Sequence, residues 1–212
     1  MAPTADHADE RPDPARDGRP AADPPKRRRR RFMVEWAVML AAGLLLATGI
    51  RTFVFEDFSV PSGSMVPTID VHDRIFAQKA FFNWHDVRQG DIVVFTHPSR
   101  DTDCAGPDDT DLVKRVIALP GQTIYSAGNS VYVDGRRLSE SYLPPHDPLG
   151  PPITGPGGKG AFHVPPGEFY VMGDNRQISC DSRYWGPIKG TSIVGRVVLL
   201  WWRHDHPDFH VF

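Results

Sequence analysis

Six consecutive basic residues, followed at once by nineteen almost uncharged ones, constrain this chain more than any other feature. The basic run covers residues 26–31, and in the apolar stretch 32–50 only Glu35 carries a charge. As an α-helix rising about 1.5 Å per residue, this stretch would be ~28 Å long, close to the ~30 Å hydrocarbon thickness of a bilayer. The pattern predicts a single transmembrane helix over residues 32–55.

Other interpretations of the stretch fit less well. A buried core helix is disfavoured, because an all-round apolar helix directly behind five arginines is costly to place in a small soluble domain. An interfacial amphipathic helix is disfavoured because residues 36–48 show no polar face. A cleaved signal peptide is the main alternative, since residues 47–49 have the small side chains of a processing site. The stretch is longer than a usual h-region of about 7 to 15 residues, and residues 53–55 continue its apolar character, which favours a retained anchor.

The segment before the anchor is predicted to be a disordered tail. Residues 1–25 contain six prolines and no aromatic residue, so they cannot bury enough surface to offset the entropy of ordering. Together with the basic run they form a tail over residues 1–31. The positive-inside rule then predicts a single-pass protein of the cytoplasmic membrane, in contact with lipid, with the tail in the cytoplasm and the rest outside.

The charge of the remaining chain argues against nucleic acid as a partner. After residue 31 there are 15 basic and 20 acidic residues, a net charge of −5. A surface with this balance cannot neutralise a row of phosphates.

The body, residues 56–212, is predicted to be mainly β. The chain has 19 glycines and 21 prolines, which favour turns and short strands over long helices. Strands are expected at 74–78, 91–97, 111–118, 122–125, 130–133, 168–172 and 192–202, each bounded by turn-forming residues. Asp134 and Gly135 predict a tight hairpin. Residues 144–167, rich in proline and glycine, are predicted to be a loop with no core of its own.

A short segment behind the anchor, PSGSMVPT at residues 61–68, carries two hydroxyl groups. A plain surface turn would explain its composition. However, the flanking prolines stiffen the segment, and Gly63 lets the backbone approach a ligand beside Ser62 and Ser64. A serine hydroxyl is a weak nucleophile and needs a neighbouring base.

Lys114 stands apart from the other three lysines of the body. With period-2 alternation it shares one strand face with Leu112, Val116 and Ala118. Burial on that face would lower the pKa of its amine. A commoner alternative is a strand lysine whose amine reaches out to water.

Residues 171–186, VMGDNRQISCDSRYWG, follow a predicted strand and are dense in hydrogen-bonding groups. Taken alone, they fit a structural loop held together by aspartate and arginine pairs.

Near the C-terminus, His204, His206 and His210 could bind a metal, but without acidic or cysteine support they are expected to be a solvated tail. We predict no metal and no cofactor.

Taken together, these segments resemble bacterial type I signal peptidases. The matching segments, in the order of the family, are PSGSMVPT (61–68), GDIVVF (90–95), LVKRVIALPGQ (112–122) and GDNRQISCDSRYWGPI (173–188). The resemblance implies an antiparallel β-sheet catalytic domain of the signal peptidase type. It also implies a serine endopeptidase that uses a Ser/Lys dyad to remove N-terminal signal peptides from exported preproteins, with small residues at the first and third positions before the cut.

The resemblance also implies roles for individual residues. Ser64 would be the nucleophile, Lys114 the general base, Ser62 a part of the oxyanion hole with the Ser64 N–H, and Ser179 the residue that orients the lysine. Structural support would come from the ion pair Asp181 with Arg183 and from the bracing partners Asp174 and Arg115. Shallow substrate pockets would be lined by Phe58, Val60, Pro61, Ile69 and Val113. Gln177 and Ile178 depart from the family, which usually places acidic or amide residues there.

Two other functions fit part of the pattern. A self-cleaving Ser/Lys regulatory protease would resemble the catalytic core, but it should carry a DNA-binding or soluble module in place of the anchor. A membrane-tethered binding or assembly protein would contain the serine and lysine by coincidence.

The two cysteines, Cys104 and Cys180, would face an oxidising compartment, and the sequence leaves a disulfide and two free thiols equally open.

Overall fold

The computed structural model describes residues 26–53, 55–79, 82–98, 111–145, 147–155, 158 and 160–212. The chain divides into two compact units, residues 1–46 and 47–212. The predicted tail over residues 1–25 and Cys104 lie outside the described residues.

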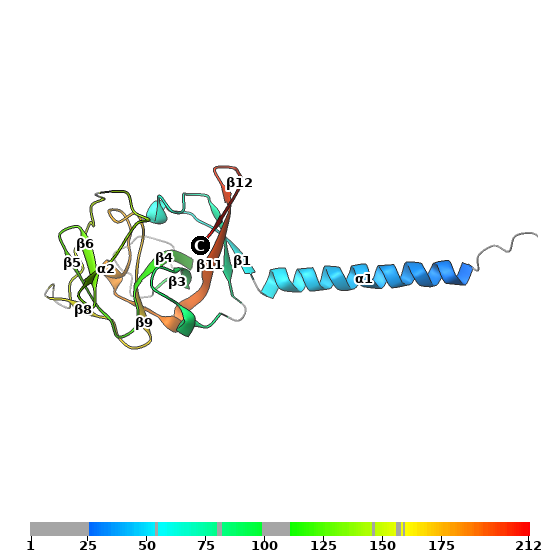
Figure 1. Cartoon of the computed structure of the whole chain (residues 1–212), viewed down its shortest axis with the longest axis horizontal. Coiled ribbons are helices and arrows are strands. Elements are labelled where there is room, and N and C mark those ends of the chain that lie inside the picture. The colour runs from blue at the N-terminus through cyan, green and yellow to red at the C-terminus, as the bar shows by residue number, and fades with distance from the viewer. Residues whose placement is uncertain are drawn as a thin grey trace, which may run out of the picture. The chain divides into compact units, whose positions relative to one another are not determined.

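The anchor prediction corresponds to one long helix. Helix α1 (Lys26–Phe53) is continuous (Figure 1). Within it, Arg29–Gly49 has a mean hydropathy of 1.8, so by length and composition it could cross a membrane. The helix begins earlier than predicted and includes the basic run, because lysine and arginine are good helix formers and the last proline before them is Pro25. It ends at Phe53 instead of residue 55, where the first strand already begins.

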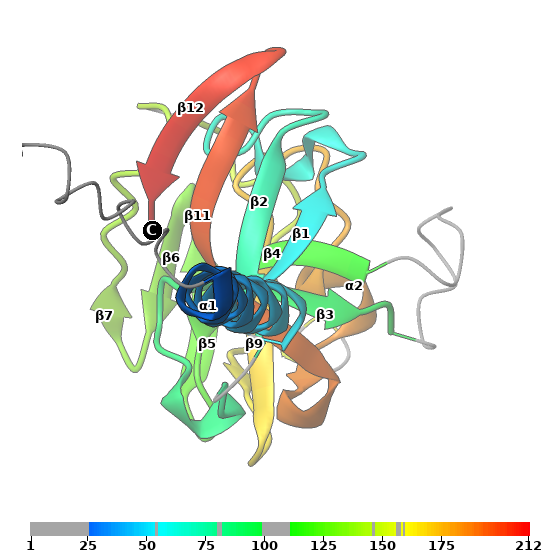
Figure 2. The ribbon, with the colours of Figure 1, turned by 90° about the vertical axis from the view of Figure 1, so that its right-hand side faces the viewer.

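The described part of the body contains one large antiparallel sheet. Its order is β1-β2-β11-β3-β4-β9-β10, and β12 pairs with β11. The strands are β1 (Phe55–Ser59), β2 (Arg74–Gln78), β3 (Ile92–Thr96), β4 (Asp111–Ala118), β9 (Glu168–Met172), β10 (Ile188–Lys189), β11 (Ile193–Arg203) and β12 (His206–Val211). Figure 2 shows β1, β2, β11 and β12 side by side.

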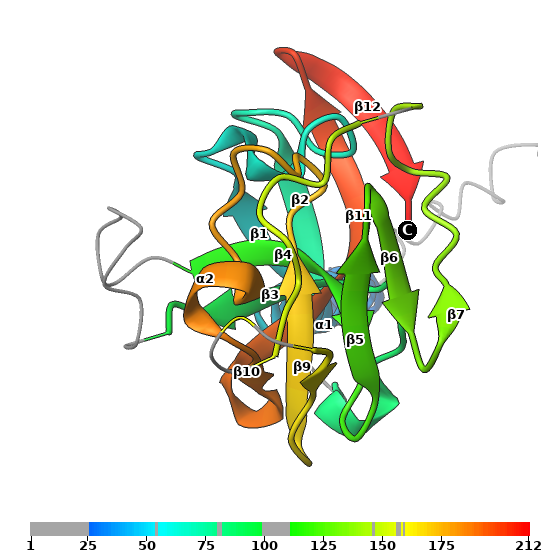
Figure 3. The same ribbon diagram turned by 90° about the vertical axis from the view of Figure 1, so that its left-hand side faces the viewer.

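A smaller antiparallel sheet has the order β7-β6-β5-β8. Its strands are β5 (Thr123–Ala127), β6 (Ser130–Val133), β7 (Arg136–Arg137) and β8 (Phe162–His163), and β5, β6 and β7 are adjacent in Figure 3. The short helical turns are η1 (Gly63–Met65), η2 (Trp84–Asp86), α2 (Ser182–Trp185) and η4 (Gly190–Ser192).

The predicted fold class, mainly antiparallel β with one N-terminal apolar helix, is confirmed. Every predicted strand is present; β2, β4, β6 and β9 have the predicted bounds, while β3, β5 and β11 differ by one or two residues. The hairpin at Asp134 and Gly135 is also confirmed, because both residues have positive φ (50° and 76°) and connect β6 to β7.

The prediction of a plain loop over residues 144–167 is wrong in part. Strand β8 pairs with β5, and Leu149, Ile153 and Val164 are buried in a core cluster that includes Ile117. Prolines and glycines separate these apolar residues, so their spacing follows neither the helix nor the strand period. Only the tertiary structure reveals that they belong to the core.

The prediction of a solvated histidine tail is wrong in part: His204, His206 and His210 are exposed, but they do not lie in a tail. The segment folds back as β12, through a turn at His204 and Asp205 with φ values of 48° and 63°. This turn contains no glycine, so its sequence carries none of the usual hairpin signals. Among the described residues, no three His, Cys, Asp or Glu side chains are grouped so that they could hold a metal ion.

Strand β4 lies where the three core clusters of the described body meet. Ile117 belongs to one cluster, Val113 packs against a second, and Val116 belongs to a third. Apolar side chains therefore cover both faces of β4, which explains how a lysine in its middle becomes buried.

Candidate active site

The structure brings together the two residues predicted to form the dyad. Ser64 lies in the turn η1 and Lys114 in the middle of β4. The Lys114 Nζ donates to Ser64 Oγ at 2.7 Å and to the carbonyl oxygen of Val113 at 3.2 Å. A hydroxyl and an amine at this distance can exchange a proton directly.

The local sequence explains why Ser64 is held so firmly. Ser62 is extended, and the Val66 N–H donates to the Gly63 carbonyl oxygen at 3.3 Å, which closes one tight turn. Met65 is fully buried and anchors this turn in the core. The tight turn and the buried Met65 side chain therefore fix the position of Ser64.

Lys114 is buried, and only 3% of it is exposed. Of the two alternatives that the strand pattern left open, the structure has the buried amine and not the one that reaches out to water. Burial lowers the pKa of Lys114 to about 8, because water no longer solvates the ammonium form. The carboxylates of Asp181 and Asp174 partly oppose this change, and the Arg183 guanidinium adds to it. A pKa near neutrality suits a general base.

Ser62 lies next to the Ser64 hydroxyl. Its Oγ donates to Ser64 Oγ at 3.3 Å. This position is within reach of a carbonyl that approaches Ser64, so the hydroxyl is available as a donor to a developing oxyanion.

A loop over residues 173–181, called here the catalytic loop, packs against the backbone of Ser64. The Asn175 N–H donates to the Ser64 carbonyl oxygen at 3.0 Å, and Asn175 Nδ2 donates to the Gly63 carbonyl oxygen at 3.2 Å. A Cβ on Gly173 would lie 2.3 Å from the Ser64 carbonyl oxygen. The interpretation of the sequence did not single out Asn175, whose only signal was its place in a polar motif.

Ser179 lies near the dyad but does not make the predicted hydrogen bond to Lys114. Its Oγ is buried and has no hydrogen-bond partner among the described residues. A Cβ on Gly173 would be 2.2 Å from this Oγ. The hydroxyl therefore lies in a tight space within the catalytic loop, near the turn that carries Ser64.

The two predicted aspartate and arginine pairs are present and hold both ends of the catalytic loop. Arg115 donates to both carboxylate oxygens of Asp174, at 2.9 and 2.6 Å. Arg183 does the same to Asp181, at 2.8 and 2.7 Å. Asp181 also accepts from the Gly173 N–H at 3.0 Å. Such two-point pairs fix orientation as well as distance.

The residues predicted to line substrate pockets lie around one core cluster. Val60 and Ile69 are members of the cluster, Phe58 and Val113 pack against it, and Pro61 is exposed. Val60 and Ile69 are 3% and 0% exposed, so they lie beneath the surface that the other three residues present.

The two residues that depart from the family pattern make contacts of their own. Gln177 donates to Asp147 at 3.3 Å. Ile178 is 67% exposed, and its Cδ1 lies 4.0 Å from the position of a Cβ on Gly63. The next residue but one, Cys180, is disulfide-bonded.

A serine activated by a buried lysine is a known variant of the serine protease mechanism. The comparisons with known proteins agree with this class. The model of the family "Signal peptidase, peptidase S26" matches residues 33–202. Signal peptidase I of Leptolyngbya laminosa is 37% identical over 186 residues, which cover 86% of this chain and 83% of that protein. Probable signal peptidase I-1 of Synechocystis sp. is 39% identical over 169 residues, 79% of this chain and 82% of that protein.

A crystal structure of a signal peptidase I from Enterococcus faecalis is also similar, at 29% identity and a TM-score of 0.43, covering 52% of this chain and 96% of that chain. The chain belongs to the signal peptidase family, peptidase S26, and it is a serine endopeptidase. The resemblance read from the sequence motifs is thereby confirmed.

Proposed function

We propose that Ser64 is the nucleophile and Lys114 the general base with which this signal peptidase cleaves preproteins. The observation that supports this assignment is the 2.7 Å hydrogen bond between Lys114 Nζ and Ser64 Oγ. Since the pKa of Lys114 is about 8, roughly one amine in ten is neutral at pH 7, against about one in 2,500 for an exposed lysine.

The reaction follows from this geometry. Neutral Lys114 takes the Ser64 proton while Ser64 Oγ attacks the scissile carbonyl carbon. The oxyanion is stabilised by the Ser62 hydroxyl and the Ser64 N–H. When the peptide bond breaks, the Lys114 ammonium returns its proton to the leaving amine and the acyl group stays on Ser64. Water, deprotonated by Lys114, then hydrolyses this ester.

The pH dependence of cleavage tests the role of the amine. Because only the neutral amine accepts a proton, activity should rise with pH on the acid limb, with a midpoint near the Lys114 pKa of about 8. Between pH 7 and 8 we expect kcat/KM to rise about fivefold, and between pH 8 and 9 about twofold. Initial rates on a fluorogenic signal-peptide substrate would give the profile; a flat profile over this range would contradict the assignment.

For the substrate, we propose small side chains at the first and third positions before the cut. Phe58 and Val113, aromatic and branched, pack against a filled core cluster, and the cyclic Pro61 is exposed next to Val60, a member of that cluster. They leave shallow apolar depressions, where charged or bulky groups meet a steric and desolvation penalty.

Cleavage of a preprotein series tests both substrate and function. Detergent-solubilised enzyme is incubated with one preprotein carrying Ala, Phe or Lys before the cut, and the new N-terminus is sequenced. We expect only the Ala form to be processed efficiently, with at least about a 100-fold advantage in kcat/KM. If the enzyme cleaved itself and left every preprotein intact, the result would instead indicate a self-cleaving protease. If neither protein were cleaved, the result would indicate a non-enzymatic protein.

For the membrane topology, we propose that α1 spans the cytoplasmic membrane with its basic end inside. The support is the basic run at the start of α1 and the apolar window Arg29–Gly49, which begins within this run. Protease added to intact spheroplasts should digest the body and spare an N-terminal tag; both should be digested after lysis. Protection of the body in intact spheroplasts would contradict this orientation.

A further inference from the structure

The catalytic loop is held from its far side by a segment that the sequence did not mark as functional. We call residues 140–145 and 147–150 the brace. Its contacts to residues 173–183 are Glu140 Oε1 with Arg176 Nη2 at 2.6 Å, Tyr142 Oη with Arg176 Nη2 at 3.2 Å, Asp147 Oδ1 with Gln177 Nε2 at 3.3 Å, and the Leu149 carbonyl oxygen with Arg183 Nη1. The brace thus contacts residues that lie on both sides of Ser179 in the sequence, in the catalytic loop and just after it.

Arg176 is the centre of these contacts. It is 1% exposed, and its ionic partner among the described residues is Glu140. Its Nη1 has no hydrogen-bond partner in the described part of the chain. A buried guanidinium depends strongly on its counter-charge, because removing one partner of a buried pair leaves an uncompensated charge.

Arg176 connects Glu140 to the nucleophile. Its Nε donates to the Gly173 carbonyl oxygen at 2.9 Å. A Cβ on Gly173 would lie 2.3 Å from the Ser64 carbonyl oxygen, and the N–H of Asn175, one residue before Arg176, donates to that same oxygen. Displacement of Arg176 would therefore move Gly173 and Asn175, the two residues that lie against the Ser64 carbonyl oxygen.

Tyr142 links the brace to the other arginine of the site. The Arg115 guanidinium lies 3.9 Å from the centre of the Tyr142 ring, a cation–π contact. Arg115 neighbours Lys114 in β4 and pairs with Asp174 in the catalytic loop. The brace therefore contacts Arg176, in the loop that packs against Ser64, and Arg115, the neighbour of Lys114.

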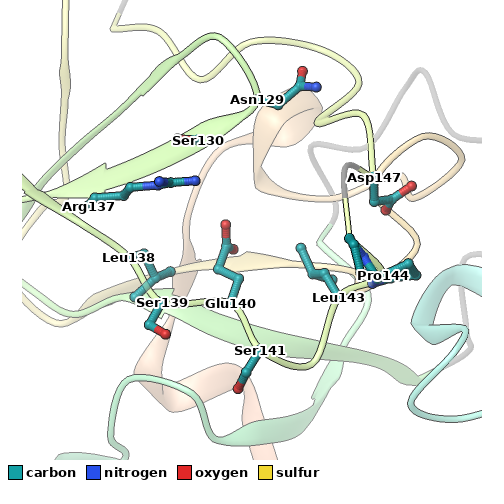
Figure 4. A pocket seen from close by; sticks show the side chains of 11 residues that line it. Asn129, Ser130, Arg137, Leu138, Ser139, Glu140, Ser141, Leu143, Pro144 and Asp147 are labelled. Atoms are coloured by element: carbon teal, nitrogen blue, oxygen red, sulfur yellow. The ribbon is translucent and has the colours of Figure 1, made fainter.

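The outer side of the brace is not packed. It borders a hollow of about 650 Å³. Figure 4 shows Glu140 and Leu143 pointing into this hollow, with Arg137 extending toward it. The Glu140 carboxylate is held by Arg176 and by the Tyr142 hydroxyl, which donates to Glu140 Oε1 at 3.1 Å, and 11% of the side chain is exposed.

We propose that Glu140 is a positioning residue for the reaction, acting through Arg176 on the catalytic loop. This proposal rests on the assignment of Ser64 and Lys114 made above. Without the Glu140 carboxylate, Arg176 turns toward water in the hollow and releases Gly173. The loop then moves from Ser64, and water reaches the Lys114 amine.

The test compares Glu140→Ala and Glu140→Gln in the full-length, membrane-inserted enzyme. For Glu140→Ala we expect kcat to fall roughly 10 to 100-fold while KM changes less than about threefold, because geometry and not substrate affinity is lost. We also expect the acid limb of the pH profile to move to higher pH, as hydration returns the Lys114 pKa toward its ordinary value. Glu140→Gln keeps the acceptor oxygen and should show a smaller change in the same direction.

Val87→Ala serves as the stability control. Val87 is buried in a core cluster that contains no residue of the brace, so this variant should lower Tm with kcat and the acid limb unchanged. If the Glu140 variants behave as Val87→Ala does, below their Tm, Glu140 is structural only and the proposal fails. Ser64→Ala, measured in parallel, separates the two proposals: cleavage by Ser64→Ala would overturn the dyad itself.

Discussion

Replacing Lys114 with arginine should abolish signal-peptide cleavage as completely as replacing it with alanine. The guanidinium group keeps its proton at any usable pH, so it cannot accept the Ser64 proton even though it preserves the positive charge. Ser64→Ala should fall to the same level, because nucleophile and base act as a unit and their losses do not add. We expect each variant to lose at least about 1,000-fold in kcat on a preprotein substrate.

Lys79→Arg is the matched control for this experiment. Lys79 is an exposed lysine paired with Glu56 at 2.7 Å, and arginine can replace it in that surface pair, so full activity is expected. Substantial turnover by Lys114→Arg in correctly folded, membrane-inserted protein would remove Lys114 as the base and leave the Ser/Lys assignment unsupported.

Thermal unfolding shows whether the Lys114 variants lose activity for chemical reasons. A folded-state pKa of about 8, against 10.5 as the ordinary value, means that the unfolded chain binds more protons between these pH values. Stability therefore rises with pH through this window, and below pH 8 the burial of the amine costs about 3 kcal/mol. Lys114→Met should accordingly have a higher Tm than the parent at pH 7, and this difference should shrink toward pH 10.5.

Most of the sheet could be predicted because its signals are local: each strand is a short run bounded by turn-forming residues. For Ser64 and Lys114 the local patterns left a plain turn and a solvated lysine open, and their proposed roles came from the resemblance of the ordered motifs to the family. The strands that escaped prediction are β1, β8, β10 and β12. Strand β8 pairs with β5, which lies far along the chain, so no short window of sequence contains that information. Strand β12 forms a hairpin with its neighbour β11, and it escaped prediction because its turn contains no glycine.

In the site, too, contacts within one motif could be predicted, and contacts between distant segments could not. The pair of Asp181 with Arg183 lies within one motif and could be expected from it, whereas Glu140 and Arg176 are 36 residues apart. Glu140 lies in a segment with no periodic pattern, so nothing in its surroundings marks it as the partner of a buried arginine. Its role becomes visible only when folding brings the brace against the catalytic loop.

Gly173→Ala is expected to have the second-largest effect on catalysis, through steric exclusion alone. The backbone of Gly173 is not in the left-handed region, so alanine meets no conformational penalty there. The added Cβ would lie 2.3 Å from the Ser64 carbonyl oxygen, 2.2 Å from Ser179 Oγ and 2.6 Å from Ser179 Cβ. Either the catalytic loop or the turn that carries Ser64 must therefore move.

Because Ser64 Oγ and Lys114 Nζ are only 2.7 Å apart, a shift of about 1 Å breaks the proton transfer, and we expect kcat to fall roughly 100-fold or more. Gly43→Ala, with no atom within 4 Å of the new Cβ, controls for the substitution itself and should keep full activity. The double variant Gly173→Ala/Ser179→Gly relieves the clash with the Ser179 side chain but not that with the Ser64 carbonyl oxygen. It should stay inactive, since the remaining clash acts directly on the nucleophile. Near-normal kcat in Gly173→Ala would show that the loop can retreat from Ser64 without loss, contrary to the view that it positions the nucleophile.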